Sequence, residues 1–191
     1  MSLLFLDVDT QLDFLFPAGS LYVPGAERIL VNLARLHHHA VAKGIPLIST
    51  ADAHTEDDPE FHSWPPHCIA GCIGQRKPES TLAQGRAVLS PNASATLRAP
   101  QVIVEKRTFD CFTNPMFEPL LDEFGIASAA VYGVVTEICV AHAVRGLLRT
   151  GRRVMLVQDA VMSLDCAKAR ALEAEVLAAG GSLATTSQLC D

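Results

Sequence analysis

One cysteine of this chain, Cys139, stands where an apolar run gives way to a helical pattern, and such a position suits a nucleophile. The run at 129–133 ends at Gly133, and from about Glu137 the apolar residues recur with the spacing of one helix face. Unpaired N–H groups and the positive end of the macrodipole favour a thiolate in the first turn of a helix. The alternative interpretation is a small apolar residue packed at a corner, as most free cysteines are.

Three carboxylates and an amide lie at the end of the first apolar run of the chain, 3–8, and just after it. They are Asp7, Asp9, Asp13 and Gln11. Ligands of open parallel sheets bind at the carboxyl ends of the strands, so this cluster indicates chemistry. Asp and Thr also serve as turn and capping residues, and part of the cluster can have that role.

A group of possible metal ligands follows the next apolar run, at 46–50. Asp52 and His54 are two residues apart, so in an extended segment they point the same way, and the following loop can return His67 to them. Imidazole and carboxylate groups suit zinc, iron or manganese. A polar loop with incidental histidines is the alternative. Glu60 and His62 are both candidates for a fourth protein ligand.

Other charged or aromatic residues near the predicted strand ends have more than one possible role. We expect Asp57 and Asp58 to be solvated. The tryptophan Trp64 can belong to the core or form an aromatic wall over a ligand. Lys106 follows the apolar run at 101–104 and is either an exposed lysine, the usual case, or a cation at the same sheet edge as Cys139.

The elements that must position these residues alternate along the chain. The patterns predict strands at 3–8, 46–50, 101–104, 129–133, 154–157 and 183–186, and helices at 26–44, 117–124, 137–149 and 167–179. This alternation predicts an α/β fold, a three-layer doubly wound sheet, mostly parallel, with about six strands and helices on both faces. We expect mostly surface connection at 71–100, and mostly solvated side chains for the three histidines at 37–39.

Composition limits the class of protein. The chain has 191 residues, 49% of them hydrophobic and 19% charged, which fits a single domain spanning 1–191. A net charge of −6 without a basic stretch argues against nucleic acid as a partner and leaves small molecules. The N-terminal segment has the pattern of neither a signal peptide nor a membrane span, so we expect a cytoplasmic protein whose six cysteines are reduced.

In their order along the chain, these motifs resemble the isochorismatase-like cysteine hydrolases, and within them the nicotinamidase/pyrazinamidase branch. The matching segments are 9–14, 19–26, 52–54 with 64–68, Lys106, and 133–140. The resemblance implies a catalytic triad of Asp9, Lys106 and Cys139 that hydrolyses a carboxamide through a thioester on Cys139. It also implies a cis peptide bond at Val134-Val135 and an oxyanion site formed by the N–H groups of Val135 and Cys139.

The resemblance further implies one divalent metal ion, zinc first and iron or manganese as alternatives. Its ligands would be Asp52, His54, His67 and Glu60, with His62 in place of Glu60 as an open alternative, and Phe14 and Trp64 would be aromatic walls of the substrate site. The implied reaction is the hydrolysis of nicotinamide to nicotinate and ammonia.

Related amidases act on ureido, carbamoyl or maleamic amides, and these substrates stay open. A catalytically silent binding or scaffold protein is a further alternative, as is a metallohydrolase in which Cys139 belongs to the core. Family members are often homo-oligomers.

Overall fold

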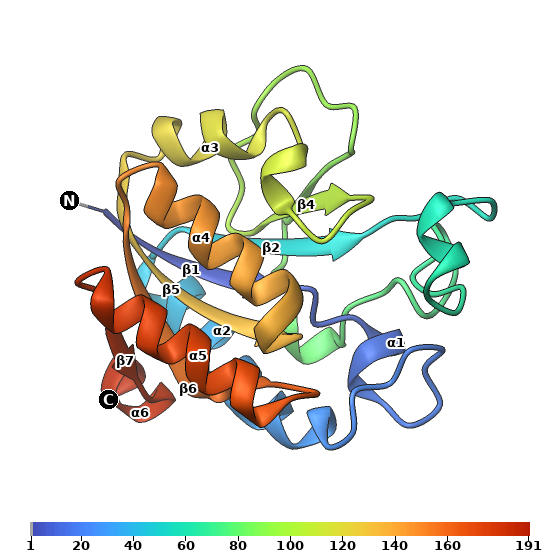
Figure 1. The fold of residues 1–191 in the computed structure, drawn as a ribbon. Coiled ribbons are helices and arrows are strands. Elements are labelled where there is room, and N and C mark those ends of the chain that lie inside the picture. Colours follow the sequence, from blue (N-terminus) through green and yellow to red (C-terminus); the bar gives the residue numbers. More distant parts are fainter. Residues whose placement is uncertain (1) are drawn as a thin grey trace.

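The computed structural model describes residues 2–191, and its centre is a parallel sheet with helices on both faces (Figure 1). The strands are β1 Ser2–Val8, β2 Leu47–Asp52, β3 Ala87–Leu89, β4 Val102–Lys106, β5 Ile126–Val134, β6 Arg153–Met162 and β7 Ser182–Ala184. Their order across the sheet is β3-β4-β2-β1-β5-β6-β7, and every neighbouring pair is parallel. The three-layer α/β prediction is confirmed, with seven strands instead of about six.

The helices form the outer two layers. On one face of the sheet lie α3 Phe117–Glu123, α4 Ala141–Arg149 and α5 Cys166–Ala178, and on the other lie α2 Leu30–Lys43 and α6 Thr186–Cys190 (Figure 1). The short helix α1 Leu12–Leu15 directly follows β1. Single turns of helix are η1 Ala26–Ile29, η2 Pro59–His62, η3 Glu79–Thr81, η4 Cys111–Thr113 and the π-helical turn η5 Thr136–Val140.

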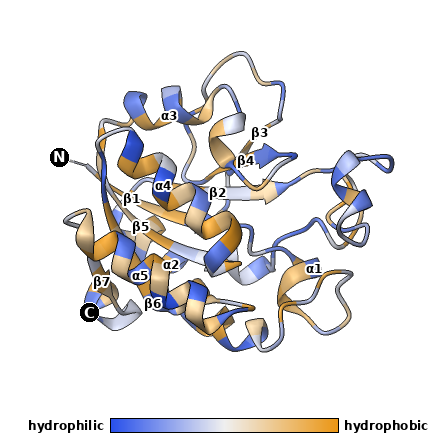
Figure 2. Ribbon diagram, in the orientation of Figure 1, coloured by the Kyte–Doolittle hydropathy of each residue, from blue (hydrophilic) through white to orange (hydrophobic). Residues whose placement is uncertain are grey.

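Strand β1 occupies the middle of the sheet because it is apolar on both of its faces. Leu6 pairs with Ile48 of β2 and with Val131 of β5, so the strand has neighbours on both edges as well. Figure 2 shows the hydrophobic colour on the central strands and on the inner sides of the helices. Continuous apolar runs of this kind are typical of parallel strands buried by helices on both sides.

Several local predictions differ from the structure. The strand β3 lies within 71–100, where surface connection was expected. It has three residues and is half exposed at the edge of the sheet, so its pattern is too short to predict. The predicted strand 183–186 is shorter, since β7 ends at Ala184 and the Thr185 capping box begins α6. Within residues 2–191 no helix is long and apolar enough to cross a membrane.

Candidate active site and metal centre

Four strands of the sheet deliver the residues that were predicted to do chemistry. The carboxyl ends of β1, β2 and β4 carry Asp9, Asp52 and Lys106, and the turn after β5 carries Cys139. The chain builds β2, β3 and β4 on one side of β1 before it places β5 on the other side. The edge beside β1 and β5 is therefore the topological switch point, where open α/β sheets bind ligands.

Asp9 is buried and held by two hydrogen bonds to one side chain. The hydroxyl of Thr50 donates to Asp9 Oδ1 at 2.6 Å and accepts from the Asp9 N–H at 3.2 Å. Asp9 has a φ of 51°, in the left-handed region that non-glycine residues seldom occupy. Such conformations persist when the surroundings impose them, and here Thr50 of the neighbouring strand does so.

Lys106 connects the predicted triad to the predicted metal site. Its Nζ lies 2.8 Å from Asp9 Oδ2, 2.5 Å from Asp52 Oδ1 and 3.9 Å from Cys139 Sγ. Although burial opposes the charged form, the two carboxylates raise the pKa of Lys106 well above its ordinary value. The lysine is therefore a buried cation, and the exposed alternative is not what the structure has.

Cys139 lies in η5, and its thiol is a hydrogen-bond partner of Asp9. Burial raises the pKa of this thiol, and the nearby carboxylates add to that rise, so the sulfur is protonated before reaction. This direction is opposite to the effect of a helix N-terminus, because burial and the two carboxylates outweigh the Lys106 ammonium, which favours the thiolate. A protonated sulfur needs a base to attack a carbonyl carbon, and Asp9 is in place to serve as one.

The backbone around Cys139 approaches its neighbours closely. Gly133 pairs with Val8, and a Cβ on Gly133 would overlap the Val8 carbonyl, so only glycine fits where β5 meets β1. The peptide bond one residue further on, Val134-Val135, is cis, as the resemblance implied. The Val135 carbonyl then accepts from the N–H groups of Ile138 and Val140, which closes the π-helical turn.

Three of the predicted metal ligands lie together. Asp52, His54 and His67 each offer one ligand atom, and these three atoms lie within 4.8 Å of one another. All three residues are buried. A carboxylate with two imidazoles is a donor set that suits zinc and other divalent transition metals. Burial lowers the pKa of His67, which keeps its ring neutral as a metal ligand must be. The residues present therefore fit a divalent ion.

The second ring nitrogen of His54 and that of His67 each have an oxygen partner. His54 Nδ1 lies 3.0 Å from Asp58 Oδ2, and His67 Nδ1 lies 2.8 Å from the Pro65 carbonyl oxygen. Carboxylate and carbonyl partners of this kind orient a ligating imidazole so that Nε2 faces the ion. The prediction that Asp58 is solvated is wrong: it is buried, since it both contacts His54 and caps η2 through the Glu60 N–H.

The two candidates for a fourth ligand occupy different places. Glu60 Oε1 lies 3.6 Å from His67 Nε2, and Glu60 lines the same pocket as Asp52 and Cys139. His62 is exposed, and its ring nitrogen lies 2.8 Å from the Pro59 carbonyl oxygen of its own turn. The structure thus brings Glu60 to the cluster and does not bring His62 there.

Gln11 orients Asp52 in a way that sequence reasoning did not anticipate. Its Oε1 accepts from the Asp52 N–H at 2.7 Å, and its Nε2 donates to the carbonyl oxygens of Asp52 at 2.9 Å and Gln75 at 2.8 Å. The Gln11 amide thus makes the two hydrogen bonds to the backbone of Asp52 that a neighbouring strand would otherwise make. The position of Gln11 beside Asp9 and Asp13 was the only signal for this role.

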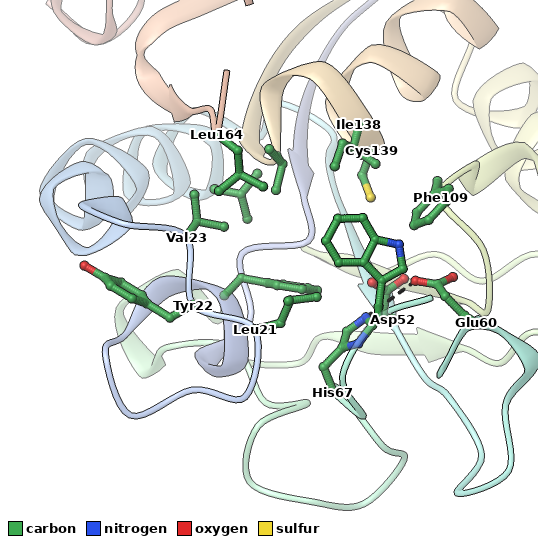
Figure 3. A pocket seen from close by; sticks show the side chains of 14 residues that line it. Leu21, Tyr22, Val23, Asp52, Glu60, His67, Phe109, Ile138, Cys139 and Leu164 are labelled. Atoms are coloured by element: carbon green, nitrogen blue, oxygen red, sulfur yellow. Dashed lines mark ion pairs between the residues drawn. The ribbon is translucent and has the colours of Figure 1, made fainter. Parts of the chain in front are cut away.

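Two members of the metal cluster, Asp52 and His67, border one largely apolar pocket together with Cys139 (Figure 3). Its lining residues are Phe14, Leu21, Tyr22, Val23, Asp52, Glu60, Trp64, His67, Phe109, Val134, Val135, Ile138, Cys139 and Leu164. In Figure 3 the Cys139 sulfur points into this space, toward the side where Asp52, Glu60 and His67 lie. Of the predicted substrate walls, Phe14 and Trp64 both line it, whereas the contribution of Leu164 and Phe109 was not predicted.

Comparison with known proteins gives a family match over nearly the whole chain. The isochorismatase domain model matches residues 3–188. The isochorismatase family protein PncA of Bacillus subtilis is 29% identical over 166 residues, which cover 83% of this chain and 85% of that protein. Streptothricin hydrolase of Streptomyces noursei is 37% identical over 89 residues, 47% of this chain and 32% of that protein. The chain therefore aligns with about a third of the streptothricin hydrolase's length.

Solved structures show the same fold. Nicotinamidase PncA of Bacillus subtilis has a TM-score of 0.83 and 23% identity, covering 96% of this chain and 99% of that chain. Pyrazinamidase of Pyrococcus horikoshii in complex with zinc has a TM-score of 0.81 and 23% identity, covering 97% and 99%. PnC1 of L. infantum in complex with nicotinate has a TM-score of 0.77 and 27% identity, covering 97% and 93%.

Proposed function

We propose that this chain, an amidohydrolase belonging to the isochorismatase family, hydrolyses nicotinamide to nicotinate and ammonia through a thioester on Cys139. The observation that carries the proposal is the placement of Lys106, which contacts Asp9 at 2.8 Å and lies 3.9 Å from Cys139 Sγ. A carboxylate, a cation and a thiol in mutual contact beside a pocket form a base, a stabilising charge and a nucleophile.

In the first step, Asp9 takes the proton of the Cys139 thiol while the sulfur attacks the carboxamide carbon. The N–H groups of Val135 and Cys139 would hold the oxygen that becomes negatively charged. Asp9 then gives the proton to the amide nitrogen, the C–N bond breaks, and ammonia leaves. Lys106 stabilises the carboxylate in both protonation changes because it is a permanent neighbouring charge.

In the second step, water attacks the thioester carbon and Asp9 takes a proton from it. The C–S bond breaks, the acid is released, and the sulfur regains its proton. Because burial raises the pKa of Cys139, the resting thiol and a nearby base are restored together. The mechanism therefore requires no further titrating group.

The metal cluster belongs to the substrate side of this pocket. Asp52, His54 and His67 would hold the ion, and Glu60 is the neighbouring carboxylate. When bound, the ion would supply a Lewis-acid contact for a pyridine nitrogen or for polarised waters. The zinc complex of the Pyrococcus pyrazinamidase supports zinc as the first choice for this chain.

The pocket lining favours a neutral, flat amide. Of the fourteen described residues that line it, none is a lysine or an arginine. Carbamoyl amino acids and maleamic acid carry a carboxylate, which would find no cationic side chain among these residues. Phe14 and Trp64 provide aromatic surface for a ring instead. Nicotinamide is therefore the first substrate to test.

The test is release of ammonia from nicotinamide by the metal-loaded protein, beside Cys139→Ala and a chelator-treated sample. Turnover that disappears in Cys139→Ala, together with a nicotinoyl adduct on Cys139 detected by mass spectrometry, would support the proposal. Turnover that survives in Cys139→Ala would defeat the cysteine mechanism and favour a metallohydrolase.

A second set of substrates separates the reaction class from the substrate. Turnover of a carbamoyl or ureido amide or of maleamic amide without turnover of nicotinamide would defeat the nicotinamidase assignment alone. Streptothricin belongs in the same panel because the relative with 37% identity over 89 residues is a streptothricin hydrolase. A folded, metal-loaded protein inactive on every amide would indicate a silent binding protein.

A further inference from the structure

One carboxylate outside the triad and outside the metal cluster holds two loops of the pocket at once. Asp13, in α1, is buried, and its Oδ1 accepts from the Ser20 N–H at 2.9 Å. Its Oδ2 accepts from the Cys68 N–H at 2.7 Å. Both are hydrogen bonds from a backbone N–H to a charged acceptor, the stronger kind of hydrogen bond.

The two loops have different functions. The loop at 17–25 carries Leu21, Tyr22 and Val23, which line the pocket. The loop at 63–73 carries His67, one member of the metal cluster, directly before Cys68. The Asp13 carboxylate is thus a shared anchor for a wall of the substrate pocket and for a metal ligand.

The surroundings leave this carboxylate little freedom. Cβ atoms built at Gly19 and Gly74 would overlap Asp13, the first at its backbone and the second at its carboxylate. Cys68 has a φ of 46°, a left-handed conformation that is strained for this residue type. The hydrogen bond to Asp13 Oδ2 holds that conformation and with it the direction in which the preceding residue, His67, leaves the backbone.

We propose that Asp13 is a positioning residue that couples metal binding to the fit of the substrate ring. The inference rests on the proposed metal site and on the proposed nicotinamidase function. If the carboxylate is removed or displaced, both loops lose the anchor that they share. A single substitution should therefore weaken metal binding and raise KM together, although Asp13 contacts neither the ion nor the reacting atoms.

The experiment compares the full chain with Asp13→Asn and Gly74→Ala. Asparagine has the size of aspartate but only one side-chain acceptor atom for two N–H donors. Alanine at Gly74 leaves the carboxylate in the chain and displaces it. The matched control is Asp159→Asn, since Asp159 Oδ1 also accepts a backbone N–H from a distant segment, that of Thr186 at 2.8 Å, but lines no part of this pocket.

Three quantities are measured for each folded protein: zinc affinity by competition with a chromogenic chelator, hydrogen exchange of the amides in both loops, and kcat and KM for nicotinamide. We expect Asp13→Asn to bind zinc about tenfold more weakly. We also expect faster exchange in both loops and a KM raised about threefold to tenfold with kcat nearly unchanged. Gly74→Ala should shift in the same direction, and Asp159→Asn should shift none of the three.

Unchanged zinc affinity and unchanged KM in a folded Asp13→Asn protein would overturn the inference, and so would a change in only one of these two quantities. Equal changes in Asp159→Asn would show general loosening and overturn it as well. If Asp13→Asn does not fold, Gly74→Ala decides. If the unsubstituted protein binds zinc but does not hydrolyse nicotinamide, the proposed function fails, and zinc affinity with loop exchange still decides the coupling.

Discussion

Thr50 makes a sharp test of how the general base is positioned, because one hydroxyl makes both of its contacts to Asp9. It donates to Oδ1 at 2.6 Å and accepts from the Asp9 N–H at 3.2 Å. Thr50→Val keeps the shape of the side chain and removes the hydroxyl. Thr50→Ser, the matched control, keeps the hydroxyl and removes a methyl group.

The expected loss of stability follows from these contacts. A hydrogen bond to a charged group contributes about 1.5–3 kcal/mol, and the orphaned N–H adds roughly 1 kcal/mol, so Thr50→Val should lower the free energy of unfolding by about 3 kcal/mol. Loss of one buried methyl group in Thr50→Ser costs about 1 kcal/mol. Urea denaturation with unchanged m-values measures both, and the difference of about 2 kcal/mol isolates the hydroxyl.

The expected loss of activity has a geometric cause. Without the hydroxyl, the ion pair with Lys106 and the Cys139 thiol are left to orient the carboxylate, and the left-handed backbone of Asp9 loses its support. Displacement of a catalytic group by about 1 Å can cost on the order of 100-fold in rate, so we expect kcat to fall tenfold to 100-fold in Thr50→Val. Thr50→Ser should stay within about threefold. A folded Thr50→Val enzyme with the kcat of the unsubstituted protein would refute this reasoning.

Three further outcomes are expected. Although burial opposes it, the Lys77 ammonium and His37 hold the pKa of Asp7 below its usual range. The ionised Asp7 therefore stabilises the fold fully above about pH 4, and this contribution is lost as the pH falls further. Asp7→Asn should lower the free energy of unfolding by about 3 kcal/mol at pH 7 and weaken its dependence on pH below pH 4, as measured by urea denaturation. Glu137 accepts hydrogen bonds from the N–H groups of Leu164 at 3.0 Å and Asp165 at 2.7 Å, and so it holds Leu164 in the pocket wall. Glu137→Ala should therefore raise KM about fivefold. If the effects of Glu137→Ala and Leu164→Ala on KM are additive in a double-mutant cycle, this explanation is contradicted. Removing the metal with a chelator should lower Tm by roughly 5–10 °C if zinc was present at about 100 times its Kd, whereas an unchanged Tm by calorimetry would show that the folded state binds no ion.

Much of the fold could be predicted from local patterns. The run at 3–8 is buried on both faces and forms the central strand β1, because a continuous apolar segment has no polar face that could be exposed to solvent. The helix predicted at 26–44 is η1 followed by α2, ended by Gly44 in the left-handed conformation that a helix C-cap favours. These features depend on residues close in sequence, where periodicity and capping carry the information.

Two predictions failed at one residue each, because the burial of a polar side chain depends on how the elements pack and not on the local pattern. The histidines at 37–39 were expected to be mostly solvated; His38 is exposed and His39 half-buried, but His37 is buried with its Nε2 3.3 Å from Asp7 Oδ2. Asp58 was also expected in solvent and instead contacts His54. The partner of His37 is Asp7 of β1, far away in sequence. The partner of Asp58 is His54, only four residues before it, but no local pattern shows that His54 is buried.

The sequence alone determined the order of the candidate catalytic and metal-binding residues along the chain and the strand ends that carry them. That order is an acid, an acid with two histidines, a lysine and a cysteine. Parallel strands place their carboxyl ends at one edge, which is why spacing along the chain was sufficient to group them. Only the tertiary structure decided that Lys106 joins Asp9 to Asp52, and that Asp13 anchors two loops. These contacts join segments far apart in sequence, and their distances follow from how the strands and loops pack, which no local pattern records.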